Sequence, residues 1–202
     1  MEIRDCDFLV IGSGIAGLSI AVRSAGLGRV VVLTKKEAAE SNTNLAQGGI
    51  AAVMAPGDSF EQHVADTLRA GVGLCHPDAV ELMVRQGPER IRELVELGTE
   101  FTRDTEGGFE LGREGGHATR RIVHASDLTG YEIEKALLAA AKRRGVEIIT
   151  NSLAYELTLA PGPDGLNQCT GAAAIEGDEV VFYRAKAVFL CAGGAGKVYL
   201  YT

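Results

Sequence analysis

The chain has 202 residues, 46% of which are hydrophobic, and a formal net charge of −7 at pH 7. This is enough apolar sequence for one domain or somewhat more with a core of its own, and the negative charge argues against nucleic acid as a partner. The first residues lack the apolar core of a signal peptide and no run approaches the ~18 apolar residues of a membrane span, so we expect a soluble, cytoplasmic protein with no membrane partner.

The first predicted elements form a strand-helix-strand unit. The apolar run Phe8–Ile11 fits a strand that is buried on both faces of a parallel sheet. The glycine-rich run Gly12–Gly17 overlaps the start of a helix predicted for Ile15 to about Leu27, and a second apolar strand follows at Val30–Leu33. This order is the context in which the pattern Gly-x-Gly-x-x-Gly predicts a dinucleotide site.

Within that run each glycine has a separate role. Gly12 permits the sharp turn after the strand, Gly14 lets a pyrophosphate approach the backbone, and Gly17 lets the helix pack closely on the strand. The helix then directs its free N–H groups and the positive end of its dipole at the phosphates. The alternative is a turn that is glycine-rich by chance, and the flanking strands favour the dinucleotide site.

The segment after the second strand differs from the usual NAD fingerprint. That fingerprint has an acid at the ribose, whereas this chain has Lys35 and reaches an acid only at Glu37. Lys35 suits a diphosphate or a ribose, or it is a solvated residue at a strand end. The small and polar residues of Ser41–Ala52 have amides and side chains that could surround a flat polar ring system. The same composition is equally typical of a linker.

Two helical regions are predicted next. The run Asp58–Glu61 is a capping box that opens a helix ending at Gly71. Another helix starts at His76–Asp78, and we expect Gly87–Pro88 to break it into two pieces, the second of which ends at Gly98.

The segment Phe109–His117 is dense in ionisable groups. It places charges and a histidine beside flexible glycines, and two arginines and His124 follow closely. Such density in a loop indicates a site for a polar, anionic substrate. A solvated surface hairpin has a similar composition, so that alternative stays open.

The remaining sequence combines a helix with several strands. A second capping box, Thr129–Glu132, begins a helix that runs to Arg144, and Val146–Thr150 follows as a short parallel strand. Three further strands are joined by turns into a meander of hairpins: about Leu153–Leu159, Gly171–Glu176 and Glu179–Arg184. A separate last strand, Ala187–Cys191, leads into a second glycine loop at residues 192–196. The pattern predicts an α/β fold with a parallel sheet and a three-stranded antiparallel meander.

The cysteines Cys6, Cys75, Cys169 and Cys191 show no ligand spacing, either with each other or with the four histidines. We therefore expect neither a metal site nor a disulfide framework.

Four motifs in this order resemble the succinate dehydrogenase and fumarate reductase flavoprotein family. They are Gly-Ser-Gly-Ile-Ala-Gly (12–17), Ala-Gln-Gly-Gly-Ile-Ala-Ala (46–52), Arg-Glu-Gly-Gly-His (113–117) and Ala-Gly-Gly-Ala-Gly-Lys-Val-Tyr (192–199). The resemblance implies a Rossmann-like FAD-binding domain that is incomplete at the carboxyl end. Residues 1–202 would be its amino-terminal part, with the capping domain and the carboxyl-terminal part absent. Because the family's proton-transferring arginine lies in the absent part, we expect no turnover by this stretch alone.

The resemblance also implies FAD as the cofactor and assigns residues to it. Ser13–Ala16 match the pyrophosphate loop, Lys35 matches a lysine that replaces the usual acid, and Asn42–Gly49 match the stretch around the ribityl chain and the flavin ring. Ala154 falls where the family's backbone contacts the adenine portion, and Ala192–Gly194 match a second cofactor loop. The expected cofactor-binding residues are Gly12, Ser13, Gly14, Ile15, Ala16, Gly17, Lys35, Asn42, Thr43, Asn44, Leu45, Ala46, Gln47, Gly48, Gly49, Ala154, Ala192, Gly193 and Gly194.

Two residues discriminate within the family. Asn42 stands where the membrane-complex members carry the histidine that bonds covalently to FAD, and an amide is not such a nucleophile, so FAD is expected to be held non-covalently. Glu114 matches the acid that some members place near a substrate ammonium, a group that succinate lacks.

The activity that the resemblance implies is oxidation of L-aspartate to iminoaspartate, the first step of de novo NAD biosynthesis. The electron acceptor would be oxygen or fumarate, and the catalytic residues would be Glu114 and His117. Two alternatives remain: a flavoprotein like fumarate reductase or succinate dehydrogenase, and a non-catalytic FAD-binding module.

Overall fold

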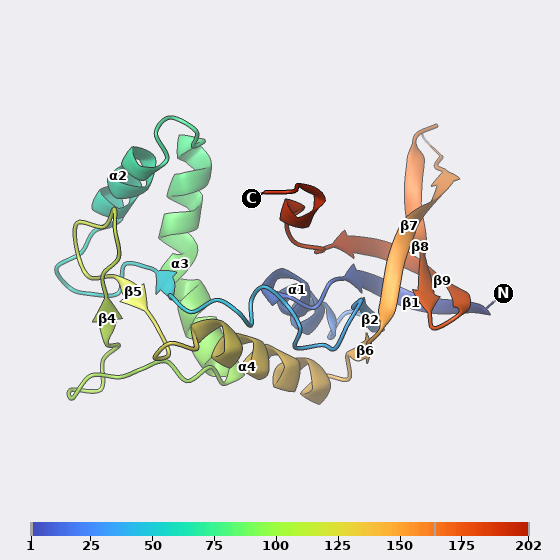
Figure 1. Ribbon diagram of the computed structural model, residues 1–202, viewed down its shortest axis with the longest axis horizontal. Helices are drawn as coiled ribbons and strands as arrows, with labels where there is room; N and C mark the ends of the chain where they lie inside the picture. The colour runs from blue at the N-terminus through green and yellow to red at the C-terminus, as the bar shows by residue number, and fades with distance from the viewer. Residues whose placement is uncertain (1, 164, 202) are drawn as a thin grey trace. The chain divides into compact units, whose positions relative to one another are not determined.

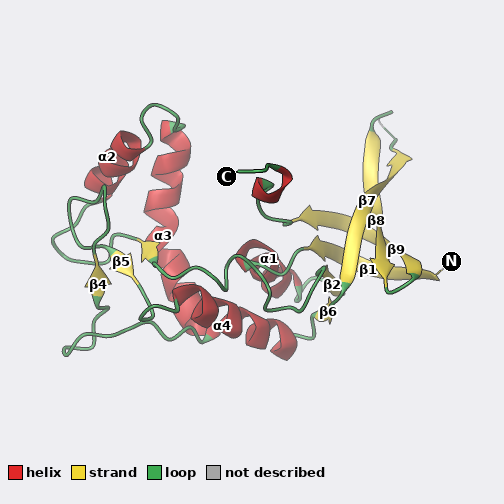
Figure 2. Cartoon of the chain, in the orientation of Figure 1, coloured by secondary structure: helices red, strands yellow, loops and turns green. Residues whose placement is uncertain are grey.

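The computed structural model describes residues 2–163 and 165–201, and the chain divides into two compact units. Unit 1 comprises Met1–Asn44 and Leu137–Thr202, and unit 2 comprises Leu45–Ala136. Figure 1 labels the helices and strands, and Figure 2 distinguishes them from the loops. Among the described residues, no helix is long and apolar enough to cross a membrane.

Unit 1 is built on one six-stranded sheet. Its strands are β1 (Glu2–Ile11), β2 (Val30–Leu33), β6 (Glu147–Ile149), β7 (Ser152–Pro161), β8 (Asn167–Glu176) and β9 (Glu179–Leu190). The strand order is β6-β2-β1-β9-β8-β7 (Figure 1). The first four strands in this order are parallel, whereas β8 and β7 continue the sheet antiparallel. The predicted α/β class, parallel sheet and three-stranded meander are therefore confirmed.

The core of unit 1 lies on both faces of the sheet. Leu9 and Tyr183 belong to a buried cluster on one face. On the other face, α1 (Ile15–Ser24) packs closely, because a Cβ on Gly17 would lie 3.3 Å from Cγ1 of Val10. The predicted end of this helix near Leu27 is wrong, because α1 ends at Ser24. The side chain of Leu27 is 78% exposed, so no apolar contact extends the helix to that residue. A short 3₁₀ helix, η1, follows the last strand at Gly196–Val198.

Two strands are longer than predicted because they pair with each other. β1 begins at Glu2 instead of Phe8 and pairs with β9 from Glu2↔Val181 to Ile11↔Leu190. The expected separation of Glu179–Arg184 from Ala187–Cys191 is wrong, since both runs belong to the 12-residue β9. One continuous ladder with β1 holds both apolar runs in a single strand.

Unit 2 contains two helices, a small sheet and the start of a further helix. The elements are α2 (Phe60–Ala70), α3 (Pro77–Leu97), β3 (Ile50–Ala51), β4 (Leu111–Gly112), β5 (Ile122–Val123) and the first part of α4 (Thr129–Arg143), which continues into unit 1. The strands form an antiparallel sheet in the order β3-β5-β4, and α2 packs against α3. The sequence does not predict this sheet, because strands of two residues are too short to show an alternating pattern.

The expected break of α3 at Gly87–Pro88 is wrong. α3 runs for 21 residues with Pro88 inside it. An internal proline removes one helical hydrogen bond, which favours a break. The buried residues of α3, however, form one stripe at spacings of three and four: Val80, Val84, Pro88, Ile91 and Leu94. Burial of this uninterrupted apolar face keeps the helix whole, and Gly98 ends it with a left-handed φ of 110°, as predicted.

The capping box predicted at Asp58–Glu61 is displaced by one residue. Ser59 is the N-cap of α2, and its hydroxyl accepts a hydrogen bond from the N–H of Gln62. Asp58 instead forms a buried ion pair with Arg121, a residue far along the chain.

The second predicted capping box is also built differently. The hydroxyl of Thr129 accepts a hydrogen bond from the N–H of Ala125 and donates one to the carbonyl of Gly48. It thus connects loops within unit 2. At the other end of α4, Gly145 has the left-handed φ of 73° that was expected of a terminating glycine.

Candidate functional site

The first glycine turn is shaped by the carbonyl groups around it. Gly12 has a φ of 112°, and a Cβ on it would lie 2.2 Å from the carbonyl oxygen of Cys191. A Cβ on Gly17 would lie 1.9 Å from the carbonyl oxygen of Gly12. Both distances are far below van der Waals contact, so only glycine fits at these positions. The turn therefore holds the start of α1 directly against the end of β1.

The N-terminus of α1 is left open for an anion. The N-cap residue is Gly14, which has no side chain to cap the helix, and the first turn contains no acid. A Cβ on Gly14 would meet only the hydroxyl of Thr43, at 3.4 Å, apart from its chain neighbours. That hydroxyl accepts a hydrogen bond of 3.0 Å from the N–H of Ile15. A helix N-terminus beside a bare glycine fits the diphosphate of a dinucleotide, whose oxygens accept the free N–H groups.

Two of the expected cofactor residues use their side chains to hold the loop itself. The buried hydroxyl of Ser13 donates to the carbonyl of Ala38 at 2.9 Å and lies 3.1 Å from Oγ1 of Thr34. The side-chain amide of Asn44 donates to the carbonyl of Ala39 at 2.8 Å. Ser13 and Asn44 are therefore expected to serve a cofactor through their backbone.

Lys35 is exposed just beyond β2 and makes no ion pair with any residue that the structure describes. Its neighbour Lys36 is instead paired with Glu40, with 2.7 Å between Nζ and Oε2. The two lysines carry the same charge at adjacent positions, but among the described residues only Lys36 has a carboxylate partner.

We expect Lys35→Ala to weaken FAD binding about tenfold at low salt, since an exposed ammonium contributes at the lower end of charge-assisted hydrogen bonds. Lys36→Ala is the matched control and should leave the affinity within about twofold. Fluorescence titration of flavin at two salt concentrations measures this, and the difference should shrink at high salt. Equal weakening by both substitutions would mean that only net charge matters.

The second glycine loop emerges at the same edge of the sheet as the first, because β9 is the parallel neighbour of β1. The N–H of Cys191 donates to the carbonyl of Ile11 at 2.8 Å, which fixes the start of the loop. Gly193 has a φ of 79°, and a Cβ on Gly194 would meet nothing within 4 Å. Unit 1 thus brings the two expected pyrophosphate and cofactor loops together at one edge.

Ala154 lies in β7 next to a β-bulge. The register with β8 shifts between Ala154 and Glu156, so one residue is left out of the ladder. A bulge frees backbone groups, which is compatible with the backbone contact expected at Ala154. That assignment stays a prediction.

The expected ring-wrapping stretch, Asn42–Gly49, crosses from unit 1 into unit 2, and most of its residues are exposed. Within unit 2, the carbonyl of Ala46 accepts a hydrogen bond of 2.8 Å from the N–H of Gly130. The carbonyl of Gly48 accepts one of 3.0 Å from the hydroxyl of Thr129. These bonds fasten this part of the stretch to the start of α4.

Unit 2 contains a polar pocket with a volume of about 270 Å³. Its lining residues are Gln47, Gly48, Gly112, Arg113, Glu114, Ile122, His124, Ser126 and Asp127. The pocket therefore joins the second motif, through Gln47 and Gly48, to the third, through Arg113 and Glu114. Oε1 of Glu114 lies 2.9 Å from the position that a Cβ on Gly48 would take, so glycine at position 48 makes room for the carboxylate.

The carboxylate of Glu114 makes no ion pair within the described part of the chain. No arginine of the described residues pairs with this carboxylate to hold the loop. The three nearby arginines have other partners: Arg113 donates to the carbonyl of His117, Arg120 donates to the carbonyl of Leu111, and Arg121 pairs with Asp58 and Asp66. Glu114 is thus available to a ligand in the pocket.

The structure places the two candidate histidines differently. The ring of His117 packs edge-on against His63, with 6.1 Å between the ring centroids, and does not line the pocket. His124 does line it, together with Ile122. The resemblance implies no role for His124, although His124 belongs to the ionisable groups that indicate a site near Phe109–His117. Its position two residues after Ile122 is consistent with both side chains lying on the same side of the chain.

The chain is similar in sequence to several known proteins. Residues 7–202 match the sequence model of a family described as FAD binding domain. The chain is 48% identical over 200 residues to L-aspartate oxidase 2-a, chloroplastic, of Nicotiana tabacum, which covers 97% of this chain and 31% of that protein. It is 47% identical over 208 residues to L-aspartate oxidase of Pseudomonas aeruginosa, covering 97% of this chain and 38% of that protein. The chain spans about a third of the length of the curated relatives it matches.

Solved structures show the same fold. Quinol fumarate reductase FrdA of E. coli, with an E245Q mutation, matches with a TM-score of 0.90 and 29% identity, over 100% of this chain and 34% of that chain. The Sdh1 complex of Mycobacterium smegmatis in the apo form matches with a TM-score of 0.88 and 31% identity, over 98% of this chain and 36% of that chain.

Proposed function

Because the chain belongs to the family of FAD binding domains, we propose that it is part of an FAD-dependent enzyme that oxidises L-aspartate to iminoaspartate. The observation that carries this proposal is the carboxylate of Glu114, which lines a pocket and makes no ion pair among the described residues. A carboxylate of this kind binds an ammonium group, which aspartate has and succinate lacks. The 48% identity to a relative named L-aspartate oxidase supports the same substrate.

The residues of unit 1 hold the cofactor. Gly12 and Gly17 shape the turn, and Gly14 leaves the N-terminus of α1 bare for the pyrophosphate. Lys35 adds a positive charge at the end of β2. When bound, FAD supplies the two-electron redox chemistry, and the protein contributes binding, orientation and electrostatics.

The pocket of unit 2 binds the substrate. Glu114 accepts a charge-assisted hydrogen bond from the ammonium group and so fixes which end of the dicarboxylate faces it. Arg113 and His124 line the same pocket and supply donors for a substrate carboxylate. The resemblance also implies a catalytic role for His117, but its ring packs against His63 and does not line this pocket, so the geometry of the pocket gives that role no support.

The proposed reaction is tested in a full-length protein that carries this region. Hydrogen peroxide formed from L-aspartate in air would support oxygen as the electron acceptor, and anaerobic turnover of aspartate with fumarate would support fumarate. A preference for succinate over aspartate would favour the second candidate, a flavoprotein like fumarate reductase, which the TM-score of 0.90 to that structure suggests. FAD binding without turnover of either substrate would favour a non-catalytic module.

For location, we propose an aqueous compartment: the cytoplasm in a bacterium or the plastid in a plant. The relatives from Nicotiana tabacum and Arabidopsis thaliana are named chloroplastic, and those from Streptomyces coelicolor and Pseudomonas aeruginosa carry no such word.

We expect FAD to be released when the protein is denatured, because the exposed amide of Asn42 cannot form the covalent bond that a histidine forms. The measurement is acid precipitation of the flavin-loaded protein, followed by centrifugation. The yellow colour should stay in the supernatant. Colour that remains with the pellet after washing would show a covalent flavin and contradict the prediction.

A further inference from the structure

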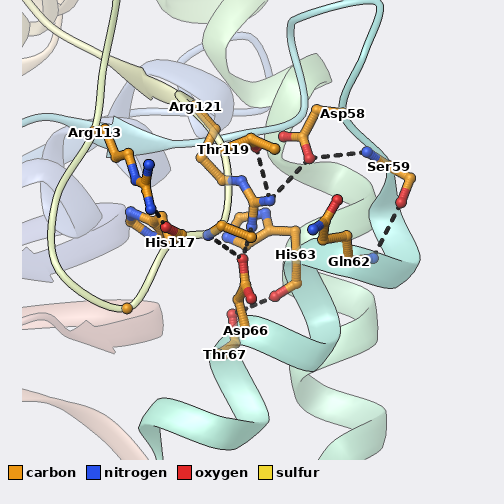
Figure 3. Close-up of polar contacts among 12 residues, drawn as sticks. Asp58, Ser59, Gln62, His63, Asp66, Thr67, Arg113, His117, Thr119 and Arg121 are labelled. Atoms are coloured by element: carbon orange, nitrogen blue, oxygen red, sulfur yellow. Dashed lines mark hydrogen bonds and ion pairs between the residues drawn. The ribbon is translucent and has the colours of Figure 1, made fainter.

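Figure 3 shows a network of charged side chains in unit 2, formed by Arg121 with Asp58 and Asp66. The guanidinium of Arg121 is fully buried and pairs with Asp58 at 2.8 Å and with Asp66 at 3.2 Å. Both carboxylates are buried as well, with side chains 1% and 3% exposed. His63 packs in the same network, and burial lowers its pKa. Burying the charges of Arg121, Asp58 and Asp66 is unfavourable unless they pair, so the ion pairs hold these side chains together.

Only one of the two carboxylates also reaches the loop that carries Glu114. Oδ2 of Asp66 accepts a hydrogen bond of 2.8 Å from the backbone N–H of Ala118. This bond is the largest cause of the lowered pKa of Asp66. Asp58 makes no bond to that loop; its other partner is the N–H of Ser59 at 2.9 Å.

Further contacts tie the same loop to this network. Arg121 donates to the hydroxyl of Thr119 at 3.0 Å. Within the loop, the His117 N–H donates to the carbonyl of Glu114 at 3.3 Å. The loop of residues 113–119 is thus anchored at its end by Asp66 and Arg121, while its start, with Glu114, lines the pocket. Arg69, which pairs with Asp66 at 2.7 Å, also donates to the carbonyl of Gly116 at 3.4 Å, and the ring of His117 packs against His63.

We propose that Asp66 is a positioning residue, which holds the 113–119 loop through the N–H of Ala118 and so places Glu114 at the pocket. The part of this proposal that concerns selectivity rests on the proposed function of Glu114. The physical reason is that a buried, ionised carboxylate needs its donors, and one of those donors is the backbone of the loop. If the loop moved away from the pocket, the buried carboxylate of Asp66 would lose its hydrogen bond from the N–H of Ala118.

Amide hydrogen exchange at Ala118 tests the proposal directly in the protein as it stands. Asp66→Ala removes the acceptor and should speed exchange about a hundredfold, whereas Asp66→Asn keeps one oxygen for the N–H and should speed it only about tenfold. Asp58→Asn is the matched control, since it also removes a buried partner of Arg121 but touches no loop amide, and should change exchange less than about threefold. If Asp66→Ala does not fold, the comparison of Asp66→Asn with Asp58→Asn decides. Equal rates in these two, or no acceleration in Asp66→Asn, would overturn the proposal.

A second readout measures selectivity in a full-length protein that carries this region. Asp66→Asn should lower the preference for aspartate over succinate about fivefold or more in the wild-type background. In the Glu114→Gln background it should change that preference no further, because the group that it positions is gone. Independent, additive effects would mean a merely structural role and would count against the proposal. If Glu114→Gln alone leaves the preference unchanged, the proposed function of Glu114 fails, and the exchange rates still decide whether Asp66 holds the loop.

Discussion

Gly17→Ala is expected to destabilise the protein strongly, by about 3 kcal/mol or more, because overpacking in a rigid place has a cost of this size. The added Cβ would lie 1.9 Å from the carbonyl oxygen of Gly12, and backbone cannot move aside as a flexible side chain can. α1 would have to leave the sheet, on which it covers Val10. For a chain of this length the melting temperature should fall by about 6–12 °C.

Two neighbouring glycines provide the comparison. Gly14→Ala adds a Cβ that would meet only the hydroxyl of Thr43, at 3.4 Å, so the fold should lose about 1 kcal/mol at most. FAD binding should nevertheless fall about a hundredfold, since the methyl group stands where the pyrophosphate approaches the backbone. Gly26→Ala is the control, because a Cβ there would meet nothing within 4 Å.

Thermal unfolding of the three variants and flavin titration of a full-length protein that carries them separate the two effects. Gly17→Ala should lose stability, Gly14→Ala should lose affinity, and Gly26→Ala should lose neither. An unchanged affinity in folded Gly14→Ala would show that no phosphate approaches this position. A melting temperature of Gly17→Ala equal to that of Gly26→Ala would contradict the tight packing of α1 on the turn.

The glycine turn could be predicted from the sequence because the spacing of its glycines and the apolar runs on both sides place it between strand and helix. The contact that excludes a side chain at Gly12 could not be predicted in this way, because it is made with the carbonyl of Cys191, far along the chain. The parallel sheet and the meander also follow from runs and turns. The continuous α3 does not, because a local breaker, Pro88, is outweighed by burial of a stripe that only the folded unit creates.

The site in unit 2 could be predicted only in part. The resemblance of a short motif points to Glu114. That no described residue forms an ion pair with Glu114 could not be predicted, because it depends on the other partners of three nearby arginines. Arg121 pairs with Asp58, which the local pattern assigned to a helix cap. Pairing across such a separation in sequence leaves no periodic signal, and the same holds for the short strands β3, β4 and β5 that bring the pocket together.

Glu114→Gln, made in a full-length protein that carries this region, is expected to weaken the binding of L-aspartate about 10- to 100-fold. A charge-assisted hydrogen bond to an ammonium contributes about 1.5–3 kcal/mol, and the amide keeps the shape of the side chain while it loses the charge. The affinity for succinate and fumarate should not fall, because neither ligand has an ammonium group to bind Glu114. It can rise, because a negative charge near their carboxylates is removed. Glu110→Gln is the control, since Glu110 is exposed on the same segment but does not line the pocket.

Side-by-side titrations of aspartate and succinate give the result, because selectivity is a ratio of two affinities measured on one variant. Damage to the loop would weaken both ligands by the same factor, as both need the pocket to be formed. Removal of an ammonium partner weakens only the ligand that has the ammonium. Parallel loss of both ligands in Glu114→Gln would therefore contradict the assignment of Glu114 as the residue that selects the amino group. The structure favours the selective outcome, since within the described residues Arg113, Arg120 and Arg121 all have partners other than Glu114.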